Sequence, residues 1–346
     1  MPLVLVTGAT GFFAQFVLDS LLDDPAGYRI RGTLRSKSKA DALLARFSPE
    51  QQKRIELIEV VDMASSDLSQ AVKGADAILH TASPYQLNVH DVERDLLKPA
   101  LEGILNVLYY ATKEPAVKFV GITSSFAAIT DLSKGGPNRP GFVYTDKDWN
   151  PAGAKDAIEL GGKGAFSYSA SKKIAEEAAW KFVETENPSF AIASFNPPMI
   201  YGPTKQPGVT RSNLNTSSRT IYGLLSSAEG MPEDRLPLFC HARDVADAHV
   251  RAISNKEAHG RRFLLCGGKF NWAMAVNHIA QTRPELKSRL PDGWDKAVSK
   301  PVSEYVTLDT KPAEEILGMT FRGWQQTLDD SIDSLIQLEQ RKDWNT

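Results

Sequence analysis

The first half of the chain alternates between short, fully apolar runs and longer stretches whose apolar residues recur at helical spacing. Runs such as residues 3–7, rich in Val and Leu, are typical of strands buried on both faces of a parallel sheet. Residues 12–22 instead place apolar side chains three and four positions apart, as one buried helix face requires. The pattern predicts strands at 3–7, 28–34, 55–61, 77–80, 118–123 and 190–196, and helices at 12–22, 39–47, 67–72, 91–111 and 165–184.

This repeated order implies parallel strands joined by right-handed crossovers, and so a Rossmann-type, doubly wound α/β sheet. Between 131 and 164 the pattern dissolves into Gly, Pro, Asn and Asp, which indicates a long surface loop of functional size. We predict a Rossmann domain at 1–201, to which 238–266 returns, and a smaller lobe at 202–237 and 267–346. In this later half the pattern predicts a strand at 263–266 and helices from 244, near 271–280, at 311–317 and at 323–341.

Composition excludes several classes of protein. With 42% hydrophobic and 24% charged residues the chain is neither disordered nor fibrous, and its net charge of -2 disfavours nucleic acid as a partner. Cys240 and Cys266 are the two cysteines, without a Cys-x-x-Cys motif or clustered His, so we expect no disulfide framework and no metal. The apolar residues 3–22 are interrupted by glycines and Asp19, which disfavours a membrane span. We expect a cytoplasmic protein.

A glycine turn joins the first predicted strand to the first predicted helix. Gly8 can adopt backbone angles closed to other residues, and Gly11 lets a pyrophosphate approach the amide groups that open the helix. Ala14 stands where a small residue allows close packing of helix on strand. The alternative is a plain strand–helix turn. The candidate phosphate-binding residues are Gly8, Ala9, Thr10, Gly11, Phe12 and Phe13.

The tips of the second and third strands carry candidate contacts to a dinucleotide. An acidic residue at the second tip would hold the 2′-hydroxyl of NAD, but Arg35 and Lys39 occur there instead and suit a 2′-phosphate. Asp62 can accept a hydrogen bond from an adenine amino group while Met63 packs on the ring. The alternatives are a solvated basic turn for the first pair and helix capping for Asp62.

Ser125, Tyr168 and Lys172 are the candidate catalytic residues. Ser125 follows the fifth strand, while Tyr168 and Lys172 are four positions apart and share one face of a predicted helix. An ammonium group beside a phenol favours phenolate, which brings proton exchange toward neutral pH. Such a pair can donate a proton to a carbonyl oxygen that a serine hydroxyl holds. The alternative is that the Tyr/Lys pair is an ordinary exposed pair on a helix surface.

Taken together, these motifs resemble the extended short-chain dehydrogenase/reductases, in particular their dihydroflavonol-4-reductase-like branch. Within that branch the similarity is greatest to fungal NADPH-dependent methylglyoxal and aldehyde/ketone reductases. Phe126 departs from the smaller residue or Tyr that often follows the catalytic Ser. The blocks that carry the resemblance are VTGATGFFAQ, LRSKSKA, VVDM, LHTASPY, ERDLLKPAL, ITSSFAA, YSASKKIAEEAAW, NPPMIYGP, LNTSS and ARDVADAHVRA.

The resemblance implies an NADPH-dependent reduction of a small-molecule carbonyl compound, with Ser125, Tyr168 and Lys172 as the catalytic triad. Tyr168 and Lys172 also contact the cofactor, Ile200 meets its carboxamide and Ser217 its phosphate. Asn106 anchors a proton-relay water, as in the wider superfamily. At the carboxyl edge of the sheet we expect an apolar substrate pocket lined by Phe13, Tyr85, Phe126 and Pro198.

Two other functions remain open from the sequence. A nucleotide-sugar epimerase or dehydratase would usually carry an acidic residue at position 35 and an Asp-Glu pair beside the serine, and this chain has neither. A non-catalytic NADP(H)-sensing regulator typically loses the Tyr or the Lys, which this chain keeps. The long helices at 91–111 and 165–184 can form a four-helix bundle with a second copy, so we expect a monomer or a homodimer.

Overall fold

The computed structural model describes residues 1–83, 89–160, 164–226 and 230–345. A seven-stranded sheet in the order β10-β7-β5-β4-β1-β2-β3 forms its centre, and every neighbouring pair is parallel. This topology confirms the predicted doubly wound α/β fold. Its strands are β1 (Leu3–Thr7), β2 (Arg29–Leu34), β3 (Ile55–Glu59), β4 (Ala77–His80), β5 (Phe119–Thr123), β7 (Ala191–Asn196) and β10 (Arg261–Leu264).

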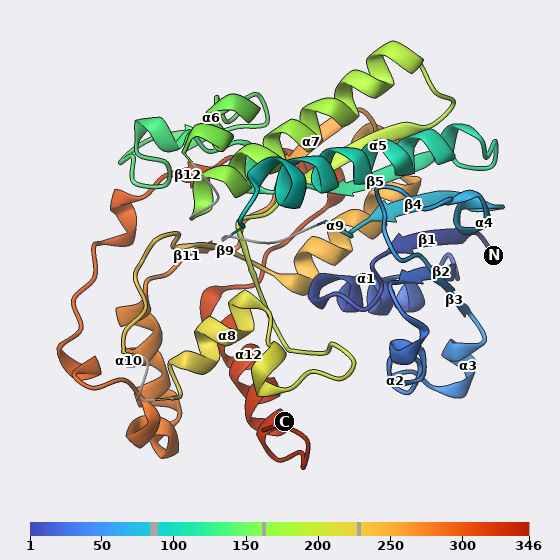
Figure 1. The fold of residues 1–346 in the computed structure, drawn as a ribbon. Helices are drawn as coiled ribbons and strands as arrows, with labels where there is room; N and C mark the ends of the chain where they lie inside the picture. Colours follow the sequence, from blue (N-terminus) through green and yellow to red (C-terminus); the bar gives the residue numbers. More distant parts are fainter. Residues whose placement is uncertain (84–88, 161–163, 227–229, 346) are drawn as a thin grey trace.

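Helices cover both faces of this sheet (Figure 1). On one face α1 (Phe12–Asp23) packs against α9 (Ala242–Ser254), and on the other α5 (Lys98–Thr112) packs against α7 (Ala165–Glu186). A single π-helical turn (Glu93–Leu97) leads into α5. The shorter helices around the sheet are α2 (Ala40–Leu44), α3 (Pro49–Gln52), α4 (Ser69–Val72) and α11 (Lys311–Leu317).

The apolar core lies in two layers, one on each side of the sheet. Side chains of α1 and α9 form the first layer with β1, and side chains of α4, α5 and α7 form the second with β4, β5 and β7. All five residues of β1 are buried, as expected for an apolar run in the middle of a parallel sheet. The hydrophobic pattern therefore predicted the core strands correctly.

The segment 131–164 is more ordered than the predicted loop. It contains β6 (Val143–Tyr144), which pairs with β12 (Thr307–Leu308), and helix α6 (Ala154–Glu159). A two-residue strand and a six-residue helix are too short for periodicity to reveal. The pairing of β6 with β12 joins residues far apart in the sequence, so that only the tertiary structure could show it.

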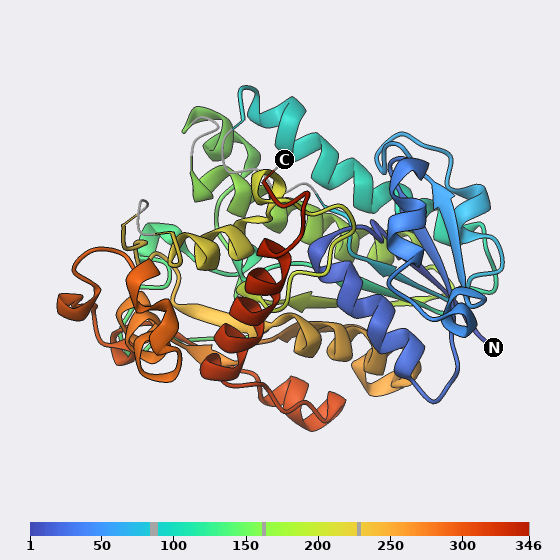
Figure 2. The same ribbon diagram turned by 90° about the horizontal axis from the view of Figure 1, so that it is seen from below.

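The remaining elements lie beyond the carboxyl edge of the main sheet (Figures 1 and 2). They form a small sheet of β8 (Met199–Tyr201), β9 (Leu238–His241) and β11 (Gly268–Lys269). The helices α8 (Thr216–Gly223), α10 (Trp272–Thr282) and α12 (Trp324–Glu339) share a separate apolar core. Within 238–266, β10 joins the main sheet and α9 covers it, whereas β9 belongs to the small sheet. The division into two domains stays a prediction.

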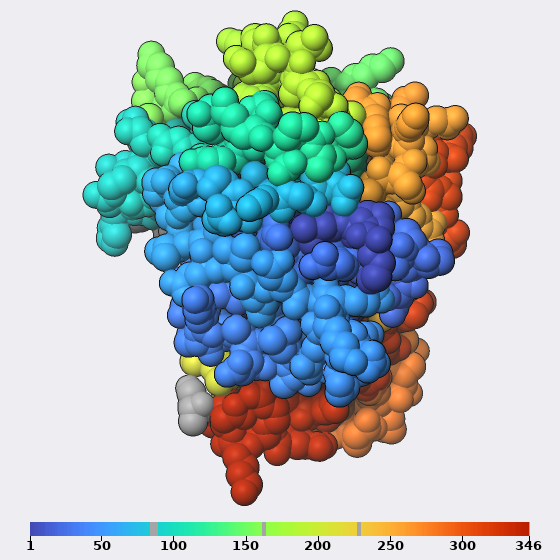
Figure 3. Space-filling view, turned by 90° about the vertical axis from the view of Figure 1, so that its right-hand side faces the viewer, coloured from blue at the N-terminus to red at the C-terminus, as the bar shows by residue number. Residues whose placement is uncertain are grey.

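The two chain termini lie well apart, the N-terminus at the start of β1 and the C-terminal segment beyond α12 (Figures 1 and 2). Figure 3 shows the N-terminal segment among residues of the first hundred, with the C-terminal segment below it. Among the described residues, no helix has the length and apolar character needed to cross a bilayer.

Candidate active site

The glycine turn leaves the amide groups at the start of α1 open. Gly8 has φ +69°, and a Cβ there would come within 3.1 Å of the Cβ of Ala82. The turn is fixed by the Gly11 amide, which donates to the Gly8 carbonyl at 2.9 Å, and by the Ala9 amide, which donates to Thr33 at 2.8 Å. No side chain caps the N-terminus of α1 at Gly11. The turn therefore has the backbone shape and the free donors that a pyrophosphate requires.

The basic residues predicted to bind a 2′-phosphate follow β2 directly. Arg35 and Lys39 are both exposed, and Lys39 ends a 3-10 turn, Lys37–Lys39. The Asp62 carboxylate accepts hydrogen bonds from Ser65 Oγ at 2.6 Å and from the Ala64 amide at 3.0 Å. These hydrogen bonds, together with the nearby Arg35, hold the pKa of Asp62 below its ordinary value. Asp62 thus organises its own turn, next to Met63, at the carboxyl end of the sheet.

Asn106 holds a turn of the main chain at the carboxyl end of the sheet. Its Nδ2 donates to the carbonyls of Met63 and Ser66, both at 2.9 Å, so the side chain holds the turn after β3. Asn106 thus supports the turn that carries Asp62 and Met63, and the proton-relay role that the resemblance implies stays a prediction.

Ser125 and the Tyr168/Lys172 pair come together because α7 packs against the 3-10 turn (Phe126–Ala128) that follows β5. Ser125 is the N-cap of that turn, and its Oγ accepts from the Ala127 amide at 3.1 Å. Tyr168 and Lys172 lie in the first two turns of α7, Tyr168 half-buried and Lys172 buried. The fold thus places a hydroxyl and a Tyr/Lys pair at one carboxyl edge.

Lys172 is a buried ammonium group whose polar surroundings come from the strands beside it. Its Nζ donates to Ser83 Oγ at 2.9 Å, just after β4. Burial lowers the pKa of Lys172 to about 8, and the negative charge of Glu176 acts in the opposite direction. The Nδ1 atom of nearby His80 lies 3.0 Å from Thr7 Oγ1. Burial lowers the pKa of His80 to about 3, so this imidazole is neutral at physiological pH.

The residues predicted to line the substrate pocket fall in different environments. Phe13 is buried in the main core, with its ring centroid 5.1 Å from that of His249. Phe126 is 1% exposed and packs against Tyr144, and Pro198 is also buried. Tyr85 lies outside the described residues. Because both phenylalanine rings pack in the core, we assign neither Phe13 nor Phe126 to a substrate pocket.

The two remaining predicted cofactor contacts lie on elements beyond the main sheet. Ile200 is half-buried in the middle of β8. Ser217 is buried in the first turn of α8, where its Oγ accepts a hydrogen bond from Asn215 Nδ2 at 2.8 Å. A separate cavity of about 470 Å³ lies between β9, β11 and α11, and none of the triad residues lines it.

Sequence reasoning missed three polar residues around the triad: Ser83, Glu176 and Arg262. Ser83 contacts Lys172, and Glu176 forms a buried ion pair with Arg262 at 2.7 Å. The position of Glu176, four residues after Lys172, was a usable signal because it predicts the same helix face. Nothing in the sequence pointed to Arg262, which reaches Glu176 from a strand 86 positions later.

The fold and these motifs together define a member of a large nucleotide-binding family. The model of the NAD dependent epimerase/dehydratase family matches residues 4–266, so the protein belongs to that family.

Within this family, two sequences and one solved structure are similar to nearly the whole chain. A putative NADPH-dependent methylglyoxal reductase of Candida albicans is 36% identical, over 96% of this chain and 98% of that protein. An NADPH-dependent methylglyoxal reductase of Saccharomyces cerevisiae is 32% identical, over 98% and 99%. The crystal structure of the yeast methylglyoxal/isovaleraldehyde reductase complexed with NADPH has a TM-score of 0.82 at 30% identity, covering 97% of this chain and 99% of that one. The predicted family resemblance is confirmed.

Proposed function

We propose that the protein is an NADPH-dependent carbonyl reductase that converts aldehydes or ketones to alcohols. The observation that carries this proposal is the convergence of Ser125, Tyr168 and the buried Lys172 at the carboxyl edge of the sheet. Its similarity to NADPH-dependent methylglyoxal reductases over nearly the whole chain supports the same function.

The residues at the carboxyl edge fit NADPH. The positive φ of Gly8 and the uncapped start of α1 suit the pyrophosphate, and the exposed Arg35 and Lys39 suit the 2′-phosphate. We assign the adenine to Asp62 and Met63, the carboxamide to Ile200 and a phosphate to Ser217. When bound, NADPH supplies the hydride that reduces the carbonyl carbon.

The protein's own residues handle the carbonyl oxygen. Ser125 donates a hydrogen bond to this oxygen, and Tyr168 donates a hydrogen bond and then the proton. The ammonium of Lys172 stabilises the tyrosinate that remains, because an opposite charge nearby favours the ionised phenol. These roles require the three side chains to face one substrate, and the packing of α7 against the turn after β5 supports that arrangement.

The test is a spectrophotometric assay of NADPH oxidation with a panel of aldehydes, ketones and α-dicarbonyls. We expect NADPH to be consumed, and NADH much more slowly, with an alcohol as product. No consumption across the panel, with tight NADPH binding retained, would favour the cofactor-sensing regulator instead. Chiral analysis of the alcohols would identify the face of the carbonyl that receives hydride.

We further propose that the protein acts in the cytoplasm as a monomer or homodimer on a small carbonyl substrate. The two free thiols suit the reducing environment of the cytoplasm and support this location. Size-exclusion chromatography with light scattering would measure the mass in solution.

A further inference from the structure

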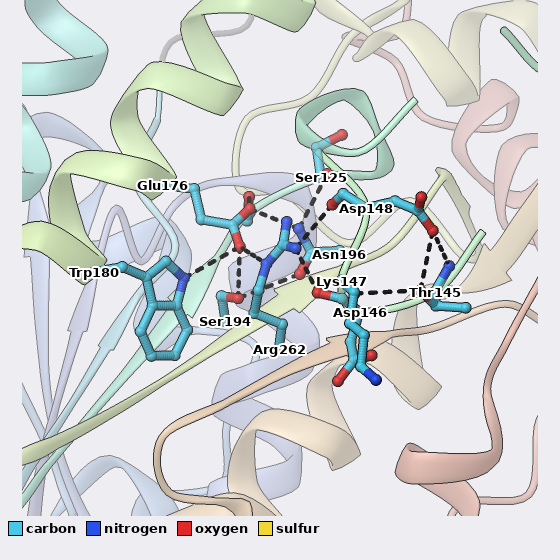
Figure 4. Close-up of polar contacts among 11 residues, drawn as sticks. Ser125, Thr145, Asp146, Lys147, Asp148, Glu176, Trp180, Ser194, Asn196 and Arg262 are labelled. Carbon is cyan, nitrogen blue, oxygen red and sulfur yellow. Dashed lines mark hydrogen bonds and ion pairs between the residues drawn. The ribbon is translucent and has the colours of Figure 1, made fainter. Parts of the chain in front are cut away.

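Glu176 is a buried carboxylate one helical turn beyond Lys172 on α7, and it is 2% exposed. It accepts hydrogen bonds from Ser194 Oγ at 2.8 Å and from Asn196 Nδ2 at 2.7 Å, both on β7. Arg262 Nε on β10 donates to it at 2.7 Å, and the Ser124 hydroxyl and Trp180 Nε1 complete the set. Figure 4 shows Trp180, Ser194, Asn196 and Arg262 pointing toward the carboxylate from several elements. A buried charge with this many donors is held in one place.

The same donors reach the backbone of the proposed active site. Asn196 Nδ2 donates both to Glu176 and, at 3.2 Å, to the carbonyl of Ser125. Ser124, which donates to Glu176, immediately precedes Ser125 in the chain. Glu176 therefore fixes the backbone before Ser125 through Ser124 and the carbonyl of Ser125 through Asn196.

Arg262 extends the network to the segment that precedes α6. Its Nη1 donates to the carbonyls of Asp146 and Asp148 at 2.5 and 2.9 Å, and its guanidinium carbon lies 3.6 Å from the ring centroid of Trp149. The guanidinium thus connects residues 146–149 to the carboxylate on α7, as Figure 4 shows for Asp146, Asp148 and Glu176. Planar stacking and multiple donors are what an arginine offers and a lysine does not.

A small cavity lies between Glu176 and Lys172. It measures about 20 Å³, which is room for one water molecule, and both side chains line it together with His80, Ser83 and Ser124. Apolar residues Ala100 and Ile104 of α5 close the other side. The charges of Glu176 and Lys172 therefore act on each other across a space about one water molecule in size.

We propose that Glu176, held by Arg262, is a positioning residue of the reductase: it fixes Ser125 and maintains the positive charge of Lys172. This inference rests on the proposed function and assigns a role within the same site. Glu176 touches neither substrate nor cofactor in this account, and it acts through the two residues that do.

Several groups face Lys172 and determine its charge. Tyr168 and Glu176 lie on its own helix, neutral His80 on β4, Ser83 after β4, and Ser124 after β5. Because burial lowers the pKa of Lys172, the carboxylate of Glu176 is the group that keeps its ammonium form populated at neutral pH. Loss of that carboxylate should deprotonate Lys172 at a lower pH.

The test is Glu176→Gln in the full-length enzyme, with Glu177→Gln as the matched control. Glu177 is the next residue of α7, is exposed and pairs with Lys173 at 2.7 Å, so that it faces away from the site. For Glu176→Gln we expect kcat to fall about tenfold and the alkaline limb of the kcat profile to move down by about one pH unit. The KM for the carbonyl compound should change less than about twofold, because Glu176 does not contact it. Glu177→Gln should behave as wild type.

A folded Glu176→Gln enzyme with the wild-type kcat and alkaline limb would overturn the proposal, since a merely structural residue changes stability alone. If this variant does not fold, Glu176→Asp supplies the test: it retains the charge but not the reach. We expect it to keep the wild-type limb with kcat lowered several-fold, and an unchanged kcat would overturn the proposal. Failure of the proposed function would look different, because wild-type protein itself would then reduce no carbonyl compound.

Discussion

Lys172 shows how burial and charge are combined at single residues of the site. Desolvation disfavours its ammonium, while Glu176 and the Ser83 hydroxyl favour it. The resulting pKa of about 8 leaves the side chain mostly charged at neutral pH yet close to titration. An exposed lysine would be charged but strongly hydrated, and its effect on Tyr168 would be screened. Burial makes this charge effective at short range.

Arg35 is the residue whose charge should decide between the two cofactors. We expect Arg35→Glu to lower the preference for NADPH over NADH at least tenfold, because a carboxylate repels the 2′-phosphate and accepts from the 2′-hydroxyl of NADH. The measurement is kcat/KM with each cofactor. Arg29→Glu, at the exposed opposite end of β2, is the control for the change in charge. An unchanged cofactor ratio in Arg35→Glu would remove Arg35 from the phosphate site.

Gly8 should tolerate no side chain. In Gly8→Ala both the positive φ and the 3.1 Å approach to Ala82 oppose the new methyl group, so we expect a loss of about 1–3 kcal/mol in stability and weaker NADPH binding. Gly27 has the same φ of +69° with no atom near its missing Cβ, which makes Gly27→Ala the matched control. Urea unfolding and NADPH titration measure both effects. Equal losses in the two variants would mean that the contact with Ala82 has no cost.

The sequence predicted the roles of those residues whose partners lie within a few positions along the chain. Tyr168 and Lys172 share a helix face because they are four residues apart, and Gly8 follows a strand that ends in a turn. The direction of the Asn106 amide was beyond such reasoning, because its two acceptors lie 40 and 43 positions earlier. The ion pair between Glu176 and Arg262 could not be predicted either, because the two residues are 86 positions apart in the sequence.

The elements of the central sheet follow closely from their hydrophobic pattern. β1 and β4 have the predicted bounds, and α7 extends two residues beyond its predicted end. Buried parallel strands are nearly all apolar, so their ends coincide with the first polar or turn residues. Elements stabilised by distant partners, such as β6 with β12, have no comparable local signal.

The turn between β3 and α4 should depend on α5 through Asn106. Asn106→Ala removes two hydrogen bonds from this turn, which should cost about 1–3 kcal/mol in stability and weaken NADPH binding several-fold. We expect kcat at saturating NADPH to stay within about twofold of wild type. Thr112→Ala, at the exposed end of the same helix, is the control. A large fall in kcat with unchanged NADPH affinity would instead support the proton-relay role that the resemblance implies.

For the molecule as a whole, buried neutral histidines should make the fold sensitive to acid. Burial lowers the pKa of His80 and His249 from 6.5 to about 3, so the unfolded chain binds protons between these values that the folded protein does not. Stability from these groups is therefore complete above pH 6.5 and falls as the pH drops toward 3.

At pH 5.5 this effect amounts to roughly 1 kcal/mol for each histidine. Urea unfolding at pH 7.5 and 5.5 measures the loss, and His249→Gln should show a smaller difference between the two pH values than wild type. The same substitution at exposed His90 serves as the control. Equal pH dependence in His249→Gln and wild type would contradict the assignment of a neutral buried imidazole.

The doubly wound architecture of the main sheet could be predicted from the sequence because strand and helix alternate through the first two hundred residues. The return of the chain to the sheet was predicted, with a strand at 263–266 where β10 spans Arg261–Leu264. The small β8–β9–β11 sheet was not predicted, because its short strands depend on tertiary packing. Because parallel strands all end at the same edge of the sheet, the sequence still predicted that the candidate catalytic residues lie at its carboxyl edge.

The most direct test of the proposed reductase is the Tyr168→Phe variant, measured for NADPH affinity and for turnover of a carbonyl compound that wild-type enzyme reduces. Phenylalanine preserves the ring but has no proton to donate. We predict a fall in kcat of at least about a hundredfold, with the Kd for NADPH within about twofold of wild type. Turnover near the wild-type rate in this variant would contradict the account.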